Sequence, residues 1–106
     1  MANIIQIVTT MDDKEAACAM GRRLVEDRLA ACCQVTGPVR SIYRWKGAIE
    51  ETEEWYCVLK TRPSLYRQVE EAILKLHPYE VPEIIAIAID EALDAYARWV
   101  EEGTSR

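Results

Sequence analysis

The chain has 106 residues, half of them apolar, which suits a single domain (residues 1–106) with one packed core. Its formal net charge is −5 and its Lys and Arg residues are scattered, so we expect no nucleic-acid partner. No segment approaches the roughly 18 to 20 consecutive apolar residues that span a bilayer, so we expect no membrane partner either.

The first quarter of the chain predicts a strand and then a helix. Residues 3–10 are rich in β-branched side chains, which favour a strand. The first three residues lead into it without the basic and then apolar order of a secretory signal, so we expect a cytoplasmic protein. Asp12 is expected to cap the helix, with Glu15 three residues later. Gly21 lies inside that helix, where close packing against a strand is a physical reason for glycine.

A long hairpin is predicted next. Residues 30–35 indicate a short strand, residues 36–38 a bend or bulge, and the alternation from residue 39 to 45 a continuation. Lys46-Gly47 predicts a turn and residues 48–61 the return strand. Strands are usually about 5 to 6 residues long, so two helices cannot cover arms of roughly twice that length. We therefore predict that the arms pair with other copies of the chain, with Tyr43, Trp45 and Trp55 at the interface.

The remaining elements complete an α+β pattern. Pro63 suits a first helical turn, and Pro78 ends that helix near His77. Residues 84–89 are nearly all apolar and predict a strand covered on both faces. Asp90 is expected to cap a last helix, and residues 103–106 to fray. The order β-α-β-β-α-β with a terminal helix predicts a ferredoxin-like sandwich, in which an antiparallel sheet lies under two helices.

Neither the cysteines nor the clustered acids have the spacing of a metal site. No two cysteines form a C-x-x-C pair, and we interpret all four as reduced, small buried side chains. They are Cys18, Cys32, Cys33 and Cys57. Four glutamates cluster on the return strand, where only alternate residues share a face, so we predict a solvated surface. They are Glu50, Glu51, Glu53 and Glu54.

Five blocks of residues, spread over nearly the whole chain, form an ordered set. They are Leu29-Ala30-Ala31-Cys32, SIYRWKGAIE at 41–50, Leu59-Lys60-Thr61, HPYEVPEII at 77–85, and Tyr96 with Trp99. In this order the blocks resemble the CutA divalent-cation-tolerance family. The resemblance implies a ferredoxin-like subunit in a homotrimer. It also implies a role in tolerance of divalent metal ions, copper especially, with metal binding by some members.

The sequence departs from the copper-binding pattern of that family. The resemblance implies a Cys near the end of the first strand and a second His before the H-P-Y block, but Val8 and Leu76 occupy those positions. His77 is then the one candidate copper ligand that remains. A transition-metal site usually has three or four ligands. The alternative for His77 is a residue at the end of a helix, where a charged imidazole interacts favourably with the helix dipole.

A candidate ligand pocket between subunits follows from the polar residues near the strand ends. We predict that Lys60, His77, Tyr79 and Glu83 form it. Lys60 is interpreted either as a partly buried amine that acts as base or anion ligand, or as the partner of Glu83 or Glu80 in an ion pair. An ion pair is the favoured alternative.

Three functions compete, and we favour a homotrimeric binding protein in metal homeostasis. The second is a trimeric signalling or small-ligand module like the nitrogen-regulatory P-II proteins. The tight turn at Lys46-Gly47 leaves no long mobile loop, which argues against P-II signalling but not against a small-ligand cleft. The third, an enzyme using Lys60, His77 and Glu83, is disfavoured, because the sequence lacks nucleophile-elbow, phosphate-loop, zinc and dinucleotide motifs.

Overall fold

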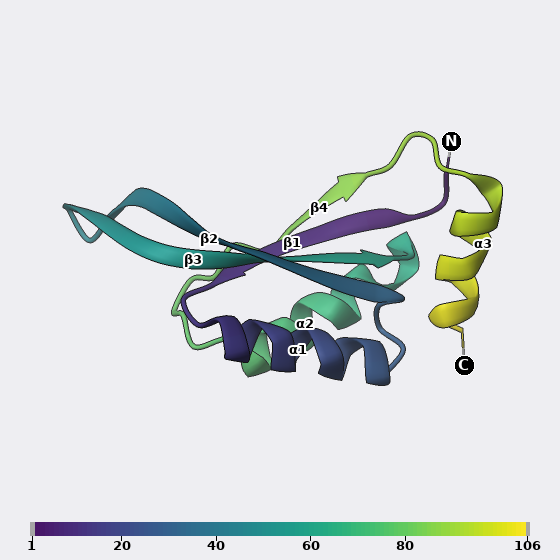
Figure 1. Cartoon of the computed structure of the whole chain (residues 1–106), viewed down its shortest axis with the longest axis horizontal. Coiled ribbons are helices and arrows are strands. Elements are labelled where there is room, and N and C mark those ends of the chain that lie inside the picture. Colours follow the sequence, from purple (N-terminus) through teal and green to yellow (C-terminus); the bar gives the residue numbers. More distant parts are fainter. Residues whose placement is uncertain (1, 106) are drawn as a thin grey trace.

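The structure is a computed structural model that describes residues 2–105. The elements that it describes are β1 (Ile5–Met11), α1 (Lys14–Glu26), β2 (Cys32–Trp45), β3 (Ala48–Thr61), the 3₁₀ turn η1 (Pro63–Leu65), α2 (Tyr66–Leu76), β4 (Ile85–Ala88) and α3 (Asp94–Gly103). The strands form one antiparallel sheet in the order β2-β3-β1-β4. Helices α1 and α2 lie side by side under one face of this sheet, and α3 lies past its end (Figure 1). The predicted order of elements and the α+β class are confirmed.

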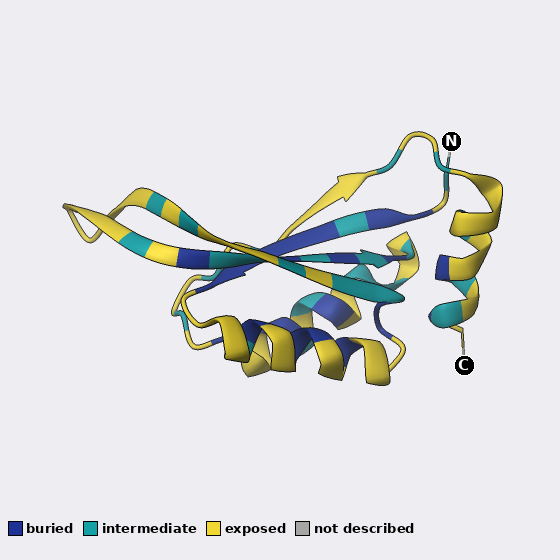
Figure 2. Ribbon diagram, in the orientation of Figure 1, coloured by how far each residue is buried: buried dark blue, intermediate teal, exposed yellow. Residues whose placement is uncertain are grey.

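The core lies between the sheet and the two helices. Strand alternation turns Ile5, Ile7 and Met11 of β1 toward α1 and α2. The apolar stripe of α1, at Ala17, Met20 and Leu24, is buried against them, while the outer sides of both helices are exposed (Figure 2). Helices α1 and α2 leave the opposite face of the sheet open (Figure 1), and among the described residues α3 reaches it only near the start of β2, where the Tyr96 hydroxyl lies 3.7 Å from Sγ of Cys32.

The hairpin extends well beyond the body of the sheet. Strand β1 pairs with β3 only from Trp55 to Thr61, so among the described strands only β2 pairs with residues 48–54. The radius of gyration is 14.3 Å, against about 13 Å for an ordinary domain of this length. The predicted bulge is present, because the register shifts between Thr36 and Val39. The turn is also confirmed: Lys46 and Gly47 both have positive φ, 49° and 84°, as in a two-residue type I′ turn.

Helix α1 begins one residue later than predicted. Asp13, and not Asp12, caps it, since the Asp13 carboxylate accepts from the backbone N–H of Glu15 at 2.8 Å and of Ala16 at 3.2 Å. The predicted close packing of Gly21 is confirmed. A Cβ atom placed on Gly21 would lie 2.5 Å from Sγ of Cys33 on β2. Glycine therefore sets how closely α1 approaches the sheet.

All four cysteines are free thiols, as expected, but their burial differs. Cys57 is buried and Cys33 is half-buried, whereas Cys18 is exposed on α1, contrary to the interpretation that all are buried. A hydrogen bond from Cys57 lowers the pKa of the Cys33 thiol, and the same bond together with burial raises the pKa of Cys57. The two thiols therefore lie together on the helix-covered face.

Strand β4 is not covered on both faces, contrary to the prediction. It is an edge strand paired only with β1, and all four of its residues are exposed (Figure 2). Ile85 and Ile87 have exposed fractions of 46% and 48%. They share the face opposite the helices with their partners Val8 and Gln6. The described residues of one chain therefore do not cover the apolar side chains of β4.

The C-terminal helix differs from the prediction at both ends. It begins at Asp94, because Asp90 is held by a backbone bond in which its carbonyl accepts from Ala2 at 2.8 Å. At the other end Thr104 is 1% exposed rather than frayed. Arg62 donates to its hydroxyl oxygen at 2.9 Å and to its carbonyl at 2.8 Å. Arg106, which was also expected to fray, lies outside the described residues.

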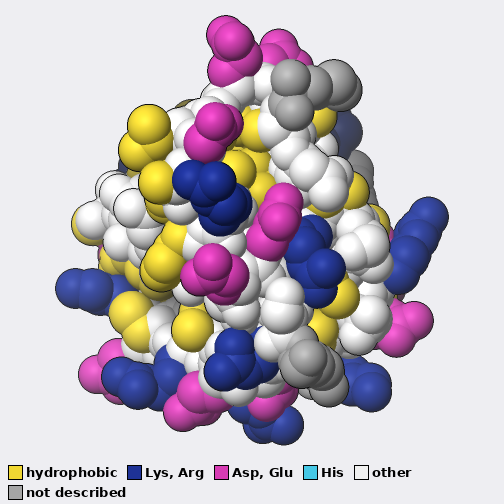
Figure 3. Space-filling view, turned by 90° about the vertical axis from the view of Figure 1, so that its right-hand side faces the viewer, with side chains coloured by type: hydrophobic (Ala, Val, Ile, Leu, Met, Phe, Trp, Pro, Cys, Tyr) yellow, Lys and Arg dark blue, Asp and Glu magenta, His cyan; other side chains and the backbone are white. Residues whose placement is uncertain are grey.

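The face at the α3 end of the molecule carries mixed charge. Acidic and basic side chains are interspersed there, with apolar atoms exposed between them (Figure 3). Mixed charge of this kind lacks the single-sign field of a nucleic-acid surface. None of the helices within residues 2–105 has the length and apolar character needed to cross a membrane.

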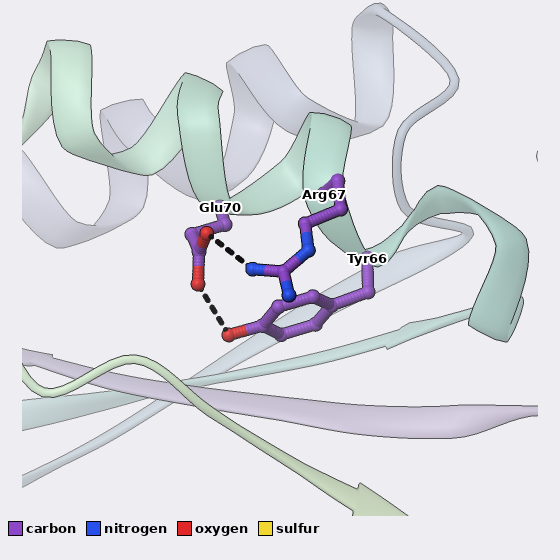
Figure 4. Close-up of polar contacts among 3 residues, drawn as sticks. All are labelled: Tyr66, Arg67 and Glu70. Carbon is purple, nitrogen blue, oxygen red and sulfur yellow. Dashed lines mark hydrogen bonds and ion pairs between the residues drawn. The ribbon is translucent and has the colours of Figure 1, made fainter.

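Helix α2 begins without a side-chain cap. In its first turns, polar contacts link the side chains of Tyr66, Arg67 and Glu70 (Figure 4). The Tyr66 hydroxyl donates to Glu70 at 2.7 Å, and Nη1 of Arg67 lies 3.2 Å from the other carboxylate oxygen. The guanidinium also lies 5.7 Å from the centre of the Tyr66 ring. The hydrogen bond from Tyr66, with Arg67 adding to it, lowers the pKa of Glu70. This cluster stabilises the helix that leads to His77.

Candidate functional site

A groove of about 720 Å³ lies between the projecting hairpin and residues 77–83, which we call the connector. Its walls come from β2, β3, the end of β1 and the connector. The lining residues are Thr10, Asp12, Val39, Arg40, Ser41, Ile42, Tyr43, Trp45, Thr52, Glu54, Tyr56, Tyr79, Glu80, Val81 and Glu83. The volume falls within the range of about 300 to 1,000 Å³ that is typical of small-molecule sites.

His77 fixes the start of the connector to the end of β1. Its backbone N–H donates to the carbonyl of Ile73 at 2.8 Å and closes α2. Its ring atom Nε2 lies 2.7 Å from the carbonyl oxygen of Thr10, which can only accept, so Nε2 carries the proton. Nδ1 accepts from the backbone N–H of Tyr79 at 3.2 Å. The imidazole is therefore neutral, and both of its nitrogens are bonded within the chain.

Tyr79 joins the connector to the hairpin. Its ring meets that of His77 edge-on, with the centroids 4.6 Å apart, and its hydroxyl donates to Glu54 of β3 at 2.7 Å. Burial, together with the hydrogen bond and the charge of Glu54, raises the pKa of Tyr79. The phenol thus stays protonated and donates. Glu54 is 6% exposed, so a carboxylate lies buried in the wall of the groove.

A second link ties the hairpin tip to the connector. Lys46 lies 3.6 Å from Glu80 in an exposed ion pair and 5.5 Å from the centre of the Trp45 ring. Exposed pairs of this kind contribute at most about 1 kcal/mol. The buried Tyr79–Glu54 bond is the stronger constraint on the shape of the groove.

The four predicted pocket residues do not all meet within one chain. His77 and Tyr79 are in contact, and Glu83 lines the same groove but is exposed. Lys60 lies elsewhere. It is four residues along β3 from Tyr56, the partner of Thr10, which corresponds to about 13 Å of strand.

The predicted ion pair of Lys60 with Glu83 or Glu80 is wrong within the chain. Nζ of Lys60 donates instead to Oε1 of Gln34 on the neighbouring strand at 3.0 Å. Glu80 is paired with Lys46. The separation of Lys60 from His77 also argues against an enzyme that uses both side chains. In general acid–base catalysis each catalytic group must lie within hydrogen-bond distance of the reacting atoms.

The three aromatic residues predicted at a subunit interface differ in exposure. Tyr43 and Trp45 are 40% and 37% exposed and line the groove. Trp55 is half-buried, packs on the core and lies close to Gly37 at the bulge. Tyr43 and Trp45 are thus available to a second molecule, whereas Trp55 faces mainly inward.

The donor set around His77 does not fit a transition-metal site in the single chain. Val8, where the sequence resemblance implies a cysteine, is buried, and Leu76, where it implies a second histidine, is 42% exposed. Both nitrogens of His77 are occupied by hydrogen bonds. Among residues 2–105, no three His, Cys, Asp or Glu side chains are grouped so that they could hold a metal ion.

Sequence reasoning missed Glu54 as a site residue. It was grouped with Glu50, Glu51 and Glu53, and those three are exposed as predicted. Strand alternation does place Glu54 on the same face as Thr52 and Tyr56. What the alternation cannot show is that the connector folds over this face. The nearest signal was the pair of prolines that stiffens residues 78–82.

The fold and groove define a class: a small α+β protein with an antiparallel sheet, a projecting hairpin and a polar groove beside it. The family model described as "CutA1 divalent ion tolerance protein" matches residues 5–103, and the chain belongs to this family. "Divalent-cation tolerance protein CutA" of Thermus thermophilus is 38% identical over 98 residues, which are 92% of this chain and 95% of that protein. The protein of the same name from Pyrococcus horikoshii is 39% identical over 103 residues, covering 97% and 100%.

Solved structures of the family share the whole fold. The divalent ion tolerance protein CutA1 of Ehrlichia chaffeensis is 32% identical, with a TM-score of 0.93 over 100% of this chain and 99% of that one. A CutA of Archaeoglobus fulgidus, described as periplasmic, is 31% identical with a TM-score of 0.93 over 96% and 99%. These likenesses confirm the resemblance drawn from the sequence blocks.

Proposed function

We propose that this protein is a cytoplasmic homotrimer of ferredoxin-like subunits that acts in tolerance of divalent metal ions, copper especially. Membership of the family supports the role, because relatives carry the name divalent-cation tolerance protein. The strand order β2-β3-β1-β4, with α1 and α2 on one face, supports the ferredoxin-like subunit. The metal ion is cargo in this proposal, and not a resident cofactor.

The observation that carries the assembly is the pair of open sheet edges. Strand β4 exposes an apolar edge, and β2 exposes a second edge 14 residues long on the opposite side of the sheet. Open edges of this kind are usually covered or paired. Two different edges on one subunit favour a head-to-tail contact, and such contacts form a ring where the rotation between neighbouring subunits closes. Covering Ile85 and Ile87 in a ring also explains an apolar strand that the single chain leaves exposed.

Calorimetry with copper tests whether His77 is a metal ligand. Because both ring nitrogens are hydrogen-bonded, we expect wild type and His77→Ala to give equal heats with copper. Cys18→Ser is the matched control for the exposed thiol, which is a soft ligand in its own right. Loss of heat in His77→Ala alone would show that the imidazole gives up a hydrogen bond to bind the metal.

The role in tolerance is tested in a copper-sensitive bacterial host. Expression of the wild-type chain is expected to raise the copper concentration at which growth stops. Ile87→Lys, which places a charge on the exposed edge strand, is expected to remove the effect if assembly is required. Growth identical to that of the empty vector would contradict the proposed role.

A second candidate function is a small-ligand-binding module. The observation that favours it is the groove beside the hairpin, with its buried carboxylate. The two-residue turn at Lys46-Gly47 still argues against the long mobile loop of P-II-type signalling.

A further inference from the structure

Two thiols lie together on the helix-covered face of the sheet. Cys33 of β2 is the partner of Leu59 on β3, and Leu59 is two residues from Cys57 on the same strand. Cys33 and Cys57 are therefore diagonal neighbours on one face, with Cα atoms about 7 to 8 Å apart and Cβ atoms somewhat closer. A hydrogen bond joins the two thiols. The hairpin thus brings together two sulfur atoms that the C-x-x-C spacing does not reveal.

Helix α1 confines both sulfur atoms along one stripe. Cys57 donates to the carbonyl oxygen of Ala17, with Sγ at 3.8 Å, and Sγ of Cys33 occupies the space that a side chain at Gly21 would need. Ala17 and Gly21 are four residues apart and hence neighbours on the same side of the helix. Cys57 is fully buried, whereas Cys33 on the edge strand β2 is half-buried. The walls of this thiol pair therefore come from one chain, and it is reached from the side of β2.

Thr9 provides an unused hydrogen-bond donor beside the pair. It is fully buried, and its hydroxyl has no partner among the described residues. It lies directly opposite Cys57 in the ladder of β1 and β3, where Cβ atoms are about 4.5 to 5.5 Å apart. Hydrogen bonds to a charged acceptor are roughly twice as strong as neutral ones. Ionisation of Cys57 to a thiolate would give this buried hydroxyl a charged acceptor.

The separation of the two thiols selects their chemistry. A disulfide requires Cα atoms no more than about 6.8 Å apart, which is less than the diagonal separation. Two thiolates on opposite sides of one metal ion span about 4.6 Å, twice a metal–thiolate bond of about 2.3 Å. Zinc usually takes four ligands, but no three His, Cys, Asp or Glu side chains within residues 2–105 are grouped around one position. Thiolates favour soft ions such as Cu(I), and a soft monovalent ion is satisfied by two of them.

We propose that Cys33 and Cys57 bind one soft monovalent metal ion, such as Cu(I) or Ag(I), between their sulfur atoms. Two metal–sulfur bonds form, both thiol protons pass to solvent, and no electron is transferred. The bound group carries a net charge of −1. The hydrogen bond with Cys57, together with the charge of Lys60, lowers the pKa of the Cys33 thiol, and the same cation offsets the charge of the bound group. His77 takes no part in this site, so the inference does not depend on the proposed function.

The test is an anaerobic titration of the full chain with Cu(I), in competition with a chromophoric Cu(I) chelator, and separately with Ag(I). The reference protein carries Cys18→Ser and Cys32→Ser, which leaves Cys33 and Cys57 as its only thiols. We expect one ion per chain and the release of close to two protons. Cys33→Ser and Cys57→Ser should each weaken binding by more than the roughly 10- to 100-fold that loss of an outer hydrogen-bond partner costs, and Thr9→Val about tenfold.

The matched control moves one thiol by a single position. A chain with Cys18→Ser and Cys33→Ser keeps Cys32 and Cys57, but adjacent strand residues point to opposite faces, so these two thiols cannot share an ion. Equal affinity of this control and the reference protein would overturn the proposal, as would no uptake by the reference protein. Loss of uptake through a disulfide between Cys33 and Cys57, seen as a mass lower by two hydrogens, would also overturn it. If Cys57→Ser does not fold, the control alone decides, because it retains Cys57.

Sedimentation of the reference protein and copper tolerance of the wild-type chain separate this inference from the proposed function. A trimer that confers tolerance but takes up no monovalent ion overturns the thiol site and leaves the proposed function standing. A chain that binds one Cu(I) or Ag(I) at the thiol pair but confers no tolerance contradicts the proposed function and supports the site.

Discussion

Removing the His77 side chain is expected to destabilise the protein strongly, although it is the one histidine of the chain and reads as a metal ligand. His77 is 9% exposed, and its ring donates to the Thr10 carbonyl at 2.7 Å and accepts from the backbone N–H of Tyr79 at 3.2 Å. His77→Ala leaves a carbonyl and an N–H without these partners. It also removes the ring contact with Tyr79 at 4.6 Å.

The expected loss in the free energy of unfolding can be estimated from these contacts. Each polar group left unsatisfied costs about 1 to 3 kcal/mol, and an aromatic pair contributes about 0.5 to 1.5 kcal/mol. Water reaching the edge of the connector offsets part of this cost. We expect His77→Ala to lower the free energy of unfolding by about 2 to 5 kcal/mol.

Two further variants separate the hydrogen bonds. The Oδ1 atom of His77→Asn can accept from Tyr79, and the Nε2 atom of His77→Gln can donate to Thr10. Each is therefore expected to cost about 1 to 2 kcal/mol, less than alanine. The assay is urea unfolding at one fixed protein concentration, because assembly makes stability depend on concentration.

A His77→Ala variant whose free energy of unfolding lies within about 0.5 kcal/mol of wild type, the scale of an ordinary surface substitution, would contradict this structural role of His77. A ¹⁵N spectrum of the imidazole provides an independent check at neutral pH. We expect the neutral tautomer with the proton on Nε2. A proton on Nδ1 would contradict the assigned hydrogen bonds.

Two other substitutions test the packing and the surface electrostatics. Gly21→Ala is expected to destabilise by about 1 to 3 kcal/mol, although alanine in a helix normally stabilises by about 1 kcal/mol, because its Cβ meets Sγ of Cys33 at 2.5 Å. Cys33→Ala should relieve most of this loss in the double variant, and additive effects in urea unfolding would refute the contact. Since the pKa of Glu70 is lowered in the folded state, its contribution is present above the unfolded pKa of about 4.3 and is lost as pH falls through the folded value. Glu70→Gln should therefore flatten the acid limb of the stability profile, and an unchanged limb would contradict the role of the Tyr66 hydrogen bond.

Much of the fold follows from local patterns in the sequence. The hairpin arms, the bulge after Thr36 and the turn at Lys46-Gly47 were predicted because each depends on a few adjacent residues. The end of α2 at His77 was predicted because proline restricts the residue before it. These features need no knowledge of what packs against them.

The parts that were wrong depend on distant contacts. Asp90 has the residue type of a helix cap, but its carbonyl is taken by Ala2 at the other end of the chain. Thr104 is buried because Arg62 reaches it from 42 residues away. The local sequence predicts that Glu54 is a surface glutamate, but Tyr79, 25 residues further along the chain, donates a hydrogen bond to it.

Strand β4 shows a different limit of local reasoning. Its four apolar residues read as a strand buried on both faces, yet one chain leaves them exposed. A hydrophobic pattern indicates that a surface is buried. It does not show whether residues of the same chain or of another copy bury it.

The proposed assembly depends most directly on the mass of the wild-type protein in solution. Sedimentation velocity at micromolar concentration is expected to give the mass of three chains of 12.1 kDa each. Ile87→Lys is expected to shift the protein toward the single-chain mass, because the lysine would be buried unpaired at the closed edge. A wild-type protein that sediments as one 12.1 kDa chain would contradict the assembly and the cover that it provides for β4.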